Sequence, residues 1–360
     1  MSAGLQKTYK LPDMAYETPV LPAGVGMDQD AVTSNQSCDV YIYKEVAQVL
    51  FPIFYTLVFL VSILGNSLVL YITCLQQQKF NSTSLYLVNL AVSDTLFSLA
   101  LPGRIAYYIL EFDWPFGDLL CRLTTVIFYT NTYAGIAFMT CISLDRYLAM
   151  VHPHRLLYLR KVQVVRGICG LVWLLVFLQT APLLFRSMLG DNRGKRTCME
   201  YFSFEGSRFL PHLLLTACTI SFCIPLLVIL GCYTQINLKL SRAARQNSVA
   251  SRSGRGHRAN SIILLVLFTF VVCFSPYHVN IMQFMVRKLL REPSCEELRA
   301  FKMSLQVTVS MMNLNCCLDP VIYFFAIKSY KQRVMSLLRG HLFTSVLSSK
   351  TMTDNSSSNT

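Results

Sequence analysis

The chain has 360 residues, of which 53% are hydrophobic and only 14% are charged. A soluble domain carries about 25% charged residues, so this composition excludes an ordinary water-soluble protein and indicates that lipid surrounds much of the chain. The net charge of +13 does not indicate a nucleic-acid partner, because the basic residues form short clusters between apolar segments, as cytoplasmic loops do.

Residues 1–47 are polar and contain several Pro and Gly residues, which predicts a largely disordered N-terminal segment. No basic-then-apolar signal pattern is present at its start, so we expect the first apolar segment to direct membrane insertion. Asn35 begins an Asn-Gln-Ser tripeptide, a glycosylation acceptor if this end of the chain lies outside the cell.

Seven apolar segments follow, and each is long enough to cross a bilayer as a helix. They lie at 48–75, 83–110, 118–151, 162–185, 209–240, 259–288 and 299–326. These segments predict an all-α membrane protein, a seven-transmembrane helix bundle over residues 48–326. Several segments contain interior prolines, among them Pro102, Pro225, Pro276 and Pro320. Neighbouring helices can satisfy the backbone groups that a proline frees, so these prolines favour kinked helices in a protein that moves, with incidental bending as the alternative.

Basic residues predict the orientation of the bundle. Lys and Arg concentrate after the third and fifth segments and in the tail, at Arg155, Arg160, Lys161, Lys239, Arg242, Arg245, Arg252, Arg255, Arg258, Lys328, Lys331, Arg333 and Arg339. Such clusters mark cytoplasmic loops, so we expect a multi-pass plasma-membrane protein with an extracellular N-terminus. Residues 327–342 predict a short amphipathic eighth helix on the membrane surface, and residues 343–360 a disordered cytoplasmic tail.

Polar residues inside the spans are functional candidates, because each is costly in lipid. Asp94, Asn131, Asn315 and Asp319 can converge from three segments, and Asn66 can join them. Carboxylate and amide oxygens suit a small cation or a proton, so a sodium ion is the one cofactor that we consider. A water-filled polar network that holds the helices together is the alternative.

Short motifs occur in order along the seven segments. They are Gly65-Asn66, LAVSD at 90–94, Asp145-Arg146-Tyr147, Trp173, Pro225 with Tyr233, FVVCFSP at 270–276 and DPVIY at 319–323. Together they resemble the rhodopsin-like class of G-protein-coupled receptors over about 290 residues. The resemblance implies a receptor with no enzyme activity.

This resemblance implies roles for matching residues. Arg146 would pair with Asp145 at rest and face a heterotrimeric G protein when active. The implied switch set also includes Tyr147, Tyr233, Phe274, Pro276, Asp319, Pro320 and Tyr323. Two disulfides are implied, Cys121–Cys198 and Cys38–Cys295. Three residues depart from the usual pattern: Phe274 replaces tryptophan, Asp319 replaces asparagine, and Gly135 replaces a serine near the cation.

The ligand site is expected among the spans at their outer ends. Phe128 stands where amine receptors carry aspartate, and Asn313 where light receptors carry the retinal lysine, so neither ligand class is expected. Tyr129 and Tyr133 are four residues apart and share a helix face. With Tyr277 and Arg104 they predict an aromatic, weakly charged pocket for a large apolar ligand with scattered hydroxyls. Helix packing of the tyrosines, with Arg104 reaching the membrane interface, is the alternative.

Longer runs resemble one branch of this class, the oxysterol receptors induced by Epstein–Barr virus. The runs are 100–108, 112–114, 128–135, 197–201 and 315–320. This resemblance implies 7α,25-dihydroxycholesterol as ligand, contacts at Arg104, Tyr129, Tyr133 and Tyr277, inhibitory G proteins and arrestin as partners, and a role in immune-cell migration. Two alternatives stay open, a peptide or chemokine-like receptor of the same class and a membrane transporter.

Overall fold

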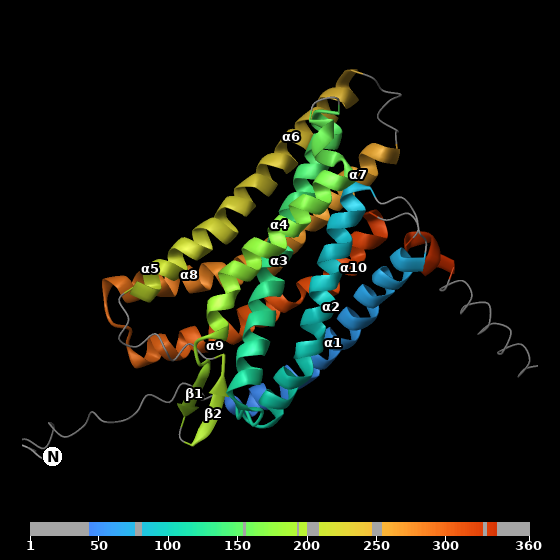
Figure 1. The fold of residues 1–360 in the computed structure, drawn as a ribbon. Coiled ribbons are helices and arrows are strands. Elements are labelled where there is room, and N and C mark those ends of the chain that lie inside the picture. The colour runs from blue at the N-terminus through green and yellow to red at the C-terminus, as the bar shows by residue number, and fades with distance from the viewer. Residues whose placement is uncertain are drawn as a thin grey trace, which may run out of the picture. The chain divides into compact units, whose positions relative to one another are not determined.

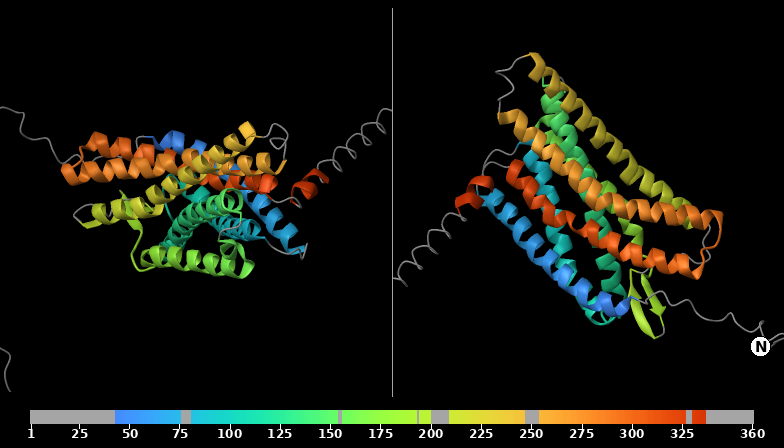
Figure 2. Two further views of the ribbon diagram at one scale, coloured as in Figure 1. Left: turned by 90° about the horizontal axis from the view of Figure 1, so that it is seen from above. Right: turned by 180° about the vertical axis from the view of Figure 1, so that it is seen from behind.

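A computed structural model of the protein describes residues 43–75, 81–153, 156–192, 194–199, 209–246, 254–326 and 330–336. The chain divides into two compact units, Met1–Cys38 and Asp39–Thr360, and the description below concerns the second unit. Within the described ranges, seven helical spans are long and apolar enough to cross a membrane. They run alongside one another as a bundle (Figures 1 and 2). The predicted fold class is therefore confirmed.

The spans closely follow the apolar segments. Their helices are α1 Lys44–Leu75, α2 Ser82–Ile109, α3 Gly117–Val151, α4 Val162–Thr180, α5 Phe209–Cys218 with α6 Ile224–Gln246, α7 Gly254–Thr269 with α8 Ser275–Leu290, and α9 Cys295–Asn313 with α10 Asn315–Ala326. The first helix begins four residues before the predicted start at 48. Its polar first turn contains Glu45, which a helix N-terminus stabilises through its dipole.

Prolines shape three of the spans. A wide π-type turn, Thr219–Cys223, joins α5 to α6 just before Pro225, and a second, Phe270–Phe274, joins α7 to α8 just before Pro276. A proline ring clashes with the carbonyl four residues earlier, and an extra residue in the turn relieves that clash. The last span is divided at Leu314, between α9 and α10. In contrast, α2 continues unbroken through Pro102.

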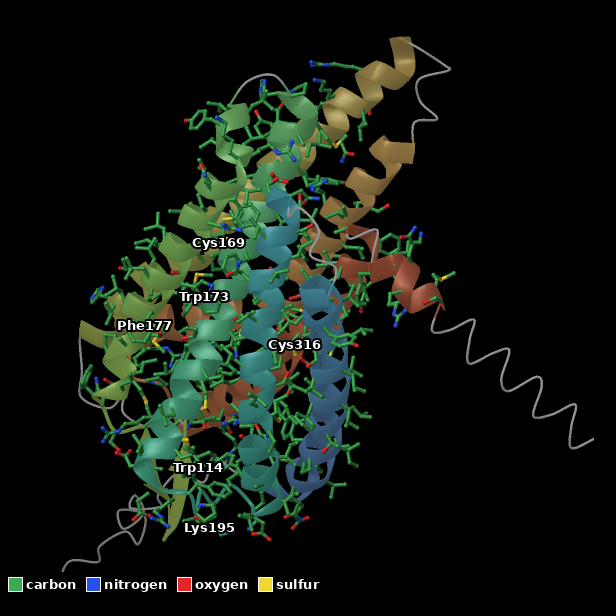
Figure 3. The ribbon with its side chains drawn as sticks, turned by 45° about the vertical axis from the view of Figure 1, so that its right-hand side comes forward. Trp114, Cys169, Trp173, Phe177, Lys195 and Cys316 are labelled. Carbon is green, nitrogen blue, oxygen red and sulfur yellow. A yellow bond between two sulfur atoms is a disulfide. The ribbon has the colours of Figure 1, made fainter. Side chains whose placement is uncertain are left out.

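Helix α3 occupies the middle of the bundle. It contacts α2, α4, α6 and α7, whereas α4 packs mainly on α2 and α3 and keeps an exposed apolar face. Trp173 of α4 points into this packing (Figure 3), and its indole N–H donates to Oδ1 of Asn89 at 2.9 Å. The exposed apolar face of α4 is expected for a peripheral helix in lipid.

Gly65 lies where α1 crosses α10. A Cβ at this position would stand 2.5 Å from Cγ of Pro320, which belongs to a rigid ring. We expect Gly65→Ala to destabilise the bundle by about 1–3 kcal/mol through overpacking, which exceeds the helix-propensity gain of about 1 kcal/mol. Gly167→Ala is the matched control, because a Cβ there has nothing within 4 Å. Thermal unfolding in detergent tests this, and equal melting temperatures for the two variants would contradict it.

A two-stranded hairpin and a short helix complete the described chain. Strands β1 (Leu189–Asn192) and β2 (Lys195–Cys198) pair antiparallel beside the connection between α2 and α3 (Figure 1). We call this end of the bundle the hairpin end, and the other the Arg146 end. Residues 330–336 are helical, and Tyr330 packs edge-on against Tyr323 at 6.4 Å. The rest of the predicted surface helix, 327–329 and 337–342, and the predicted tail lie outside the described residues.

Candidate functional site

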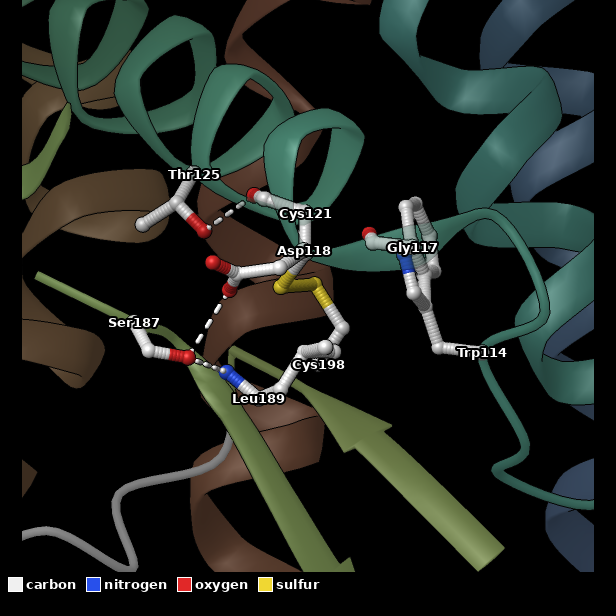
Figure 4. The surroundings of a disulfide bond; sticks show 8 residues. All are labelled: Trp114, Gly117, Asp118, Cys121, Thr125, Ser187, Leu189 and Cys198. Atoms are coloured by element: carbon white, nitrogen blue, oxygen red, sulfur yellow. Dashed lines mark hydrogen bonds between the residues drawn. A yellow bond between two sulfur atoms is a disulfide. The ribbon is translucent and has the colours of Figure 1, made fainter.

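A disulfide ties the hairpin to the first turns of α3. Cys121 and Cys198 are bonded (Figure 4), which confirms this predicted pair. Ser187, before the hairpin, donates to Asp118 Oδ1 of α3 at 2.8 Å. Cys295, the first residue of α9, is also disulfide-bonded. Its predicted partner Cys38 and the predicted glycosylation residue Asn35 lie outside the described residues.

The α2–α3 connection holds the second strand of the hairpin. The backbone N–H of Trp114 donates to the Arg196 carbonyl at 2.7 Å, and the backbone N–H of Arg196 donates to Oδ1 of Asp113 at 3.0 Å. Lys195 pairs with Glu111 at 2.7 Å, and this ammonium group holds the pKa of the Glu111 carboxyl below its usual value. These contacts fix the strand over the ends of α2 and α3 that lie at the hairpin end.

Arg104 lies beneath this hairpin on α2. Its guanidinium carbon is 5.4 Å from the ring centroid of Tyr107 and 5.2 Å from that of Tyr108, close enough for cation–π attraction. Arg104 also lines a cavity of about 10 Å³. The other lining residues are Phe97, Ala100, Leu101, Thr124, Phe128, Met199 and Asn313. That volume holds about one water, so a larger ligand requires side chains such as Met199 to move.

The three predicted ligand-contacting tyrosines gather deeper in the bundle. Tyr129 and Tyr133 stack at 6.3 Å on α3, as their spacing predicts. Tyr133 and Tyr277 both meet the ring of His278 edge-on, at 6.4 and 5.0 Å. Arg104 is not in this group, but Phe128 connects the two regions, since it lines the Arg104 cavity and packs on Tyr129 at 5.2 Å.

The sequence prediction assigned no role to His278 in this cluster. Its side chain is fully buried, and its ring stacks on Phe222 at 4.3 Å with only 3° between the planes. Nδ1 lies 2.8 Å from the Phe274 carbonyl oxygen, while Nε2 has no hydrogen-bond partner in the part of the chain that the structure describes. Its position next to Tyr277 was the only signal in the sequence that could have revealed it.

The intramembrane polar residues form a connected cluster. Asn131 donates to Oδ1 of Asp94 at 2.9 Å and to Ser93 at 3.2 Å, and the Tyr323 hydroxyl donates to Oδ2 of Asp94 at 3.5 Å. Asp319 is fully buried and interacts directly with Asp94. Neither Asp319 oxygen accepts a hydrogen bond from a described residue. Two buried carboxylates that interact are stabilised by a shared proton or by a cation between them.

Gly135, which departs from the usual serine, lies beside Phe274 and Asn315. A Cβ at Gly135 would meet Cζ of Phe274 at 3.3 Å and Nδ2 of Asn315 at 3.4 Å. Because glycine has no side chain, Phe274 and Asn315 can pack close to the backbone of Gly135. Nδ2 of Asn315 and Oδ1 of Asn66 have no hydrogen-bond partner among the described residues.

Asp145 is the centre of a polar cluster at the Arg146 end. It accepts hydrogen bonds from Ser82 and Thr83 of α2, each at 2.5 Å, and from Nε of Arg160 at 2.8 Å. The Arg146 guanidinium is 3.4 Å from Oδ2 of Asp145. The pairing with Arg146 is the predicted one, but Ser82, Thr83 and Arg160 were not predicted as partners. They are distant in sequence or carried by a different element.

The other predicted switch residues are spread along the bundle. Tyr147 pairs with His152 at 3.1 Å at the Arg146 end, and Tyr233 is half-buried on α6. Phe274, two residues before Pro276, is buried and packs on Phe270 at 5.5 Å. The hydroxyl of Tyr323 points to Asp94 and not to Arg146. A rearrangement beside Arg146 would therefore require Tyr323 to release Asp94.

Comparison with known proteins gives consistent matches. A family profile described as "7 transmembrane receptor (rhodopsin family)" matches residues 65–323. G-protein coupled receptor 183 of Rattus norvegicus is 47% identical over 320 residues, covering 88% of this chain and 90% of that protein. The Homo sapiens protein of the same name is 46% identical, covering 88% and 89%. The uracil nucleotide/cysteinyl leukotriene receptor of Homo sapiens is 33% identical, covering 81% and 77%.

Proposed function

The chain belongs to the rhodopsin family of seven-transmembrane receptors, and we propose that it is activated by oxysterols of the 7α,25-dihydroxycholesterol type. It is a multi-pass plasma-membrane protein whose partners are a heterotrimeric G protein and the lipid membrane. We further propose that the N-terminus is extracellular, that the G protein is of the inhibitory class, that arrestin binds the active receptor, and that signalling directs immune-cell migration.

The observation that carries the ligand proposal is the spacing of polar groups along an aromatic site. Arg104 lies near the hairpin end, and the Tyr133–Tyr277 cluster lies deeper, with the Phe128 ring between the two regions. A rigid apolar molecule with hydroxyls at separate positions matches such an arrangement. The sequence resemblance to the oxysterol receptors supports the same ligand class.

The Asp145 cluster supports a signalling role for the Arg146 end. Arg146 is held by Asp145, which is itself anchored to α2 and to the loop residue Arg160. A ligand that prefers a rearranged bundle shifts the equilibrium towards it and releases this cluster. Arg146 is then free to contact the G protein.

The function can be tested in cells that express the chain, with surface expression confirmed by an epitope tag. Addition of 7α,25-dihydroxycholesterol should suppress stimulated cAMP, and pertussis toxin should abolish the suppression. Untransfected cells are the control. Suppression by chemokine or peptide panels and not by the sterol would instead support the peptide-receptor alternative. No sterol response at normal surface levels would refute the proposal.

We also propose that a sodium ion binds between Asp94 and Asp319, with Asn131 and Asn315 alongside. The two carboxylate oxygens of Asp319 and Oδ1 of Asn66, which accept no hydrogen bond from a described residue, fit a small hard cation. Such an ion would neutralise the two buried carboxylates and favour the arrangement in which Tyr323 bonds Asp94.

A salt response follows from this sodium proposal. Sodium should lower agonist affinity, because an ion that favours the resting arrangement opposes a ligand that favours the other. Replacing NaCl with N-methylglucamine chloride should therefore raise agonist affinity several-fold in membranes. Asp94→Asn should remove this difference. An equal salt response in wild type and Asp94→Asn, measured by competition binding, would refute the sodium site.

A further inference from the structure

We propose that Nε2 of His278 accepts a hydrogen bond from a ligand hydroxyl, which makes His278 a specificity-determining residue of the ligand site. The inference rests on the proposed function and adds a chemical requirement to it. The deep end of the site would select a ligand group that donates a hydrogen bond.

The backbone determines which ring nitrogen carries the proton. Nδ1 of His278 lies 2.8 Å from the carbonyl oxygen of Phe274, one helical turn earlier. A carbonyl oxygen only accepts hydrogen bonds, so Nδ1 must carry the hydrogen. A neutral imidazole has one N–H, and Nε2 is therefore an acceptor.

The surroundings of the ring favour the neutral form. The groups packed on it are the rings of Phe222, Tyr133 and Tyr277, together with the Phe274 carbonyl. None of these is an anion, and a buried imidazolium without a counter-ion is strongly disfavoured. The imidazole therefore presents a lone pair at Nε2.

No described residue donates a hydrogen bond to this lone pair. His278 is 0% exposed, and Nε2 has no hydrogen-bond partner among the described residues. Buried polar atoms are nearly always hydrogen-bonded, so an unpartnered one requires a reason. Here the ring that carries it contacts two of the tyrosines of the proposed ligand site, and a ligand hydroxyl at this position would supply the missing donor.

The two ends of the site then select ligand groups with opposite hydrogen-bonding roles. An arginine side chain only donates hydrogen bonds, so the ligand group at Arg104 must accept. His278 Nε2 only accepts, so the ligand group beside it must donate. A hydroxyl satisfies either end, but a ketone or ether satisfies only Arg104. We therefore expect sterols that have a ketone at the deep position to bind poorly.

A matched pair of variants tests this assignment. The amide of His278→Asn can replace Nδ1 but leaves no group at Nε2, whereas His278→Gln can place its amide oxygen near Nε2. His278→Phe keeps the stack on Phe222 and removes both nitrogens. The probes are radiolabelled 7α,25-dihydroxycholesterol and competing analogues that each lack one hydroxyl, with binding normalised to surface protein.

The expected result is a loss that depends on one hydroxyl. His278→Asn and His278→Phe should weaken diol binding about three- to tenfold, the range for one neutral hydrogen bond, while His278→Gln stays closer to wild type. For one analogue, wild type and His278→Asn should bind equally, because the partner hydroxyl is already missing. Unchanged diol binding, or an equal loss for every analogue, would overturn the inference. Failure of wild type to bind the diol would instead refute the proposed function itself.

Discussion

Arg104→Ala is expected to weaken binding of 7α,25-dihydroxycholesterol by about ten- to a hundredfold, which corresponds to about 1.5–3 kcal/mol for a hydrogen bond to a charged group. The guanidinium is held over Tyr107 and Tyr108, so its position is set before the ligand arrives and little side-chain entropy is lost on binding. Competition binding at matched surface levels measures the effect.

Two further variants separate charge from position. Arg104→Lys keeps the charge but loses the planar stack, so an intermediate loss is expected. Lys195→Ala removes a basic residue that is paired with Glu111 on the exposed hairpin, and we expect less than about a twofold change, since surface pairs contribute little. If Arg104→Ala binds the diol as wild type does, Arg104 does not belong to the site.

Asp145→Asn is expected to raise signalling in the absence of ligand. Asp145 is buried and holds Arg146, Arg160 and two hydroxyls of α2, so loss of its charge removes a negative charge from beside both guanidinium groups. Both arginines are partly exposed, which limits the cost to about 1–2 kcal/mol. The ratio of active to resting receptor should therefore rise roughly five- to thirtyfold.

Agonist-independent binding of GTPγS to membranes measures this basal activity. Arg160→Ala should raise it less, because one of the contacts to Asp145 is lost and Arg146 remains paired. Arg166→Ala, which changes an exposed arginine on α4, is the control and should behave as wild type. Basal activity in Asp145→Asn at the wild-type level would show that the cluster does not restrain the resting state.

The seven spans could be predicted from the sequence because a continuous apolar run of sufficient length has few alternatives in a membrane. The side-chain directions on α3 could also be predicted. Asn131 reaches Asp94 while Tyr129 and Tyr133 stack on another face, as a period of 3.6 residues requires. These features depend on local spacing, which hydropathy and motif order record directly.

Other features depend on contacts that local spacing does not record. The partners of Asp145 on α2 are 63 and 62 residues away, and a hydropathy pattern cannot select them from other Ser and Thr residues. The wide turns before Pro225 and Pro276 are backbone adjustments that leave the apolar pattern unchanged. The acceptor role of His278 Nε2 follows from the hydrogen bond between Nδ1 and the Phe274 carbonyl, which is known only once the helix is folded.

Saturation binding of radiolabelled 7α,25-dihydroxycholesterol is the most direct test of the oxysterol-receptor proposal. Membranes that contain the wild-type chain should show saturable binding that unlabelled diol displaces and that cholesterol, which lacks both added hydroxyls, does not. Membranes with an equal amount of Arg104→Ala should show much weaker binding. Absence of saturable binding to wild type, with surface protein confirmed, would contradict the assignment of this receptor to oxysterols.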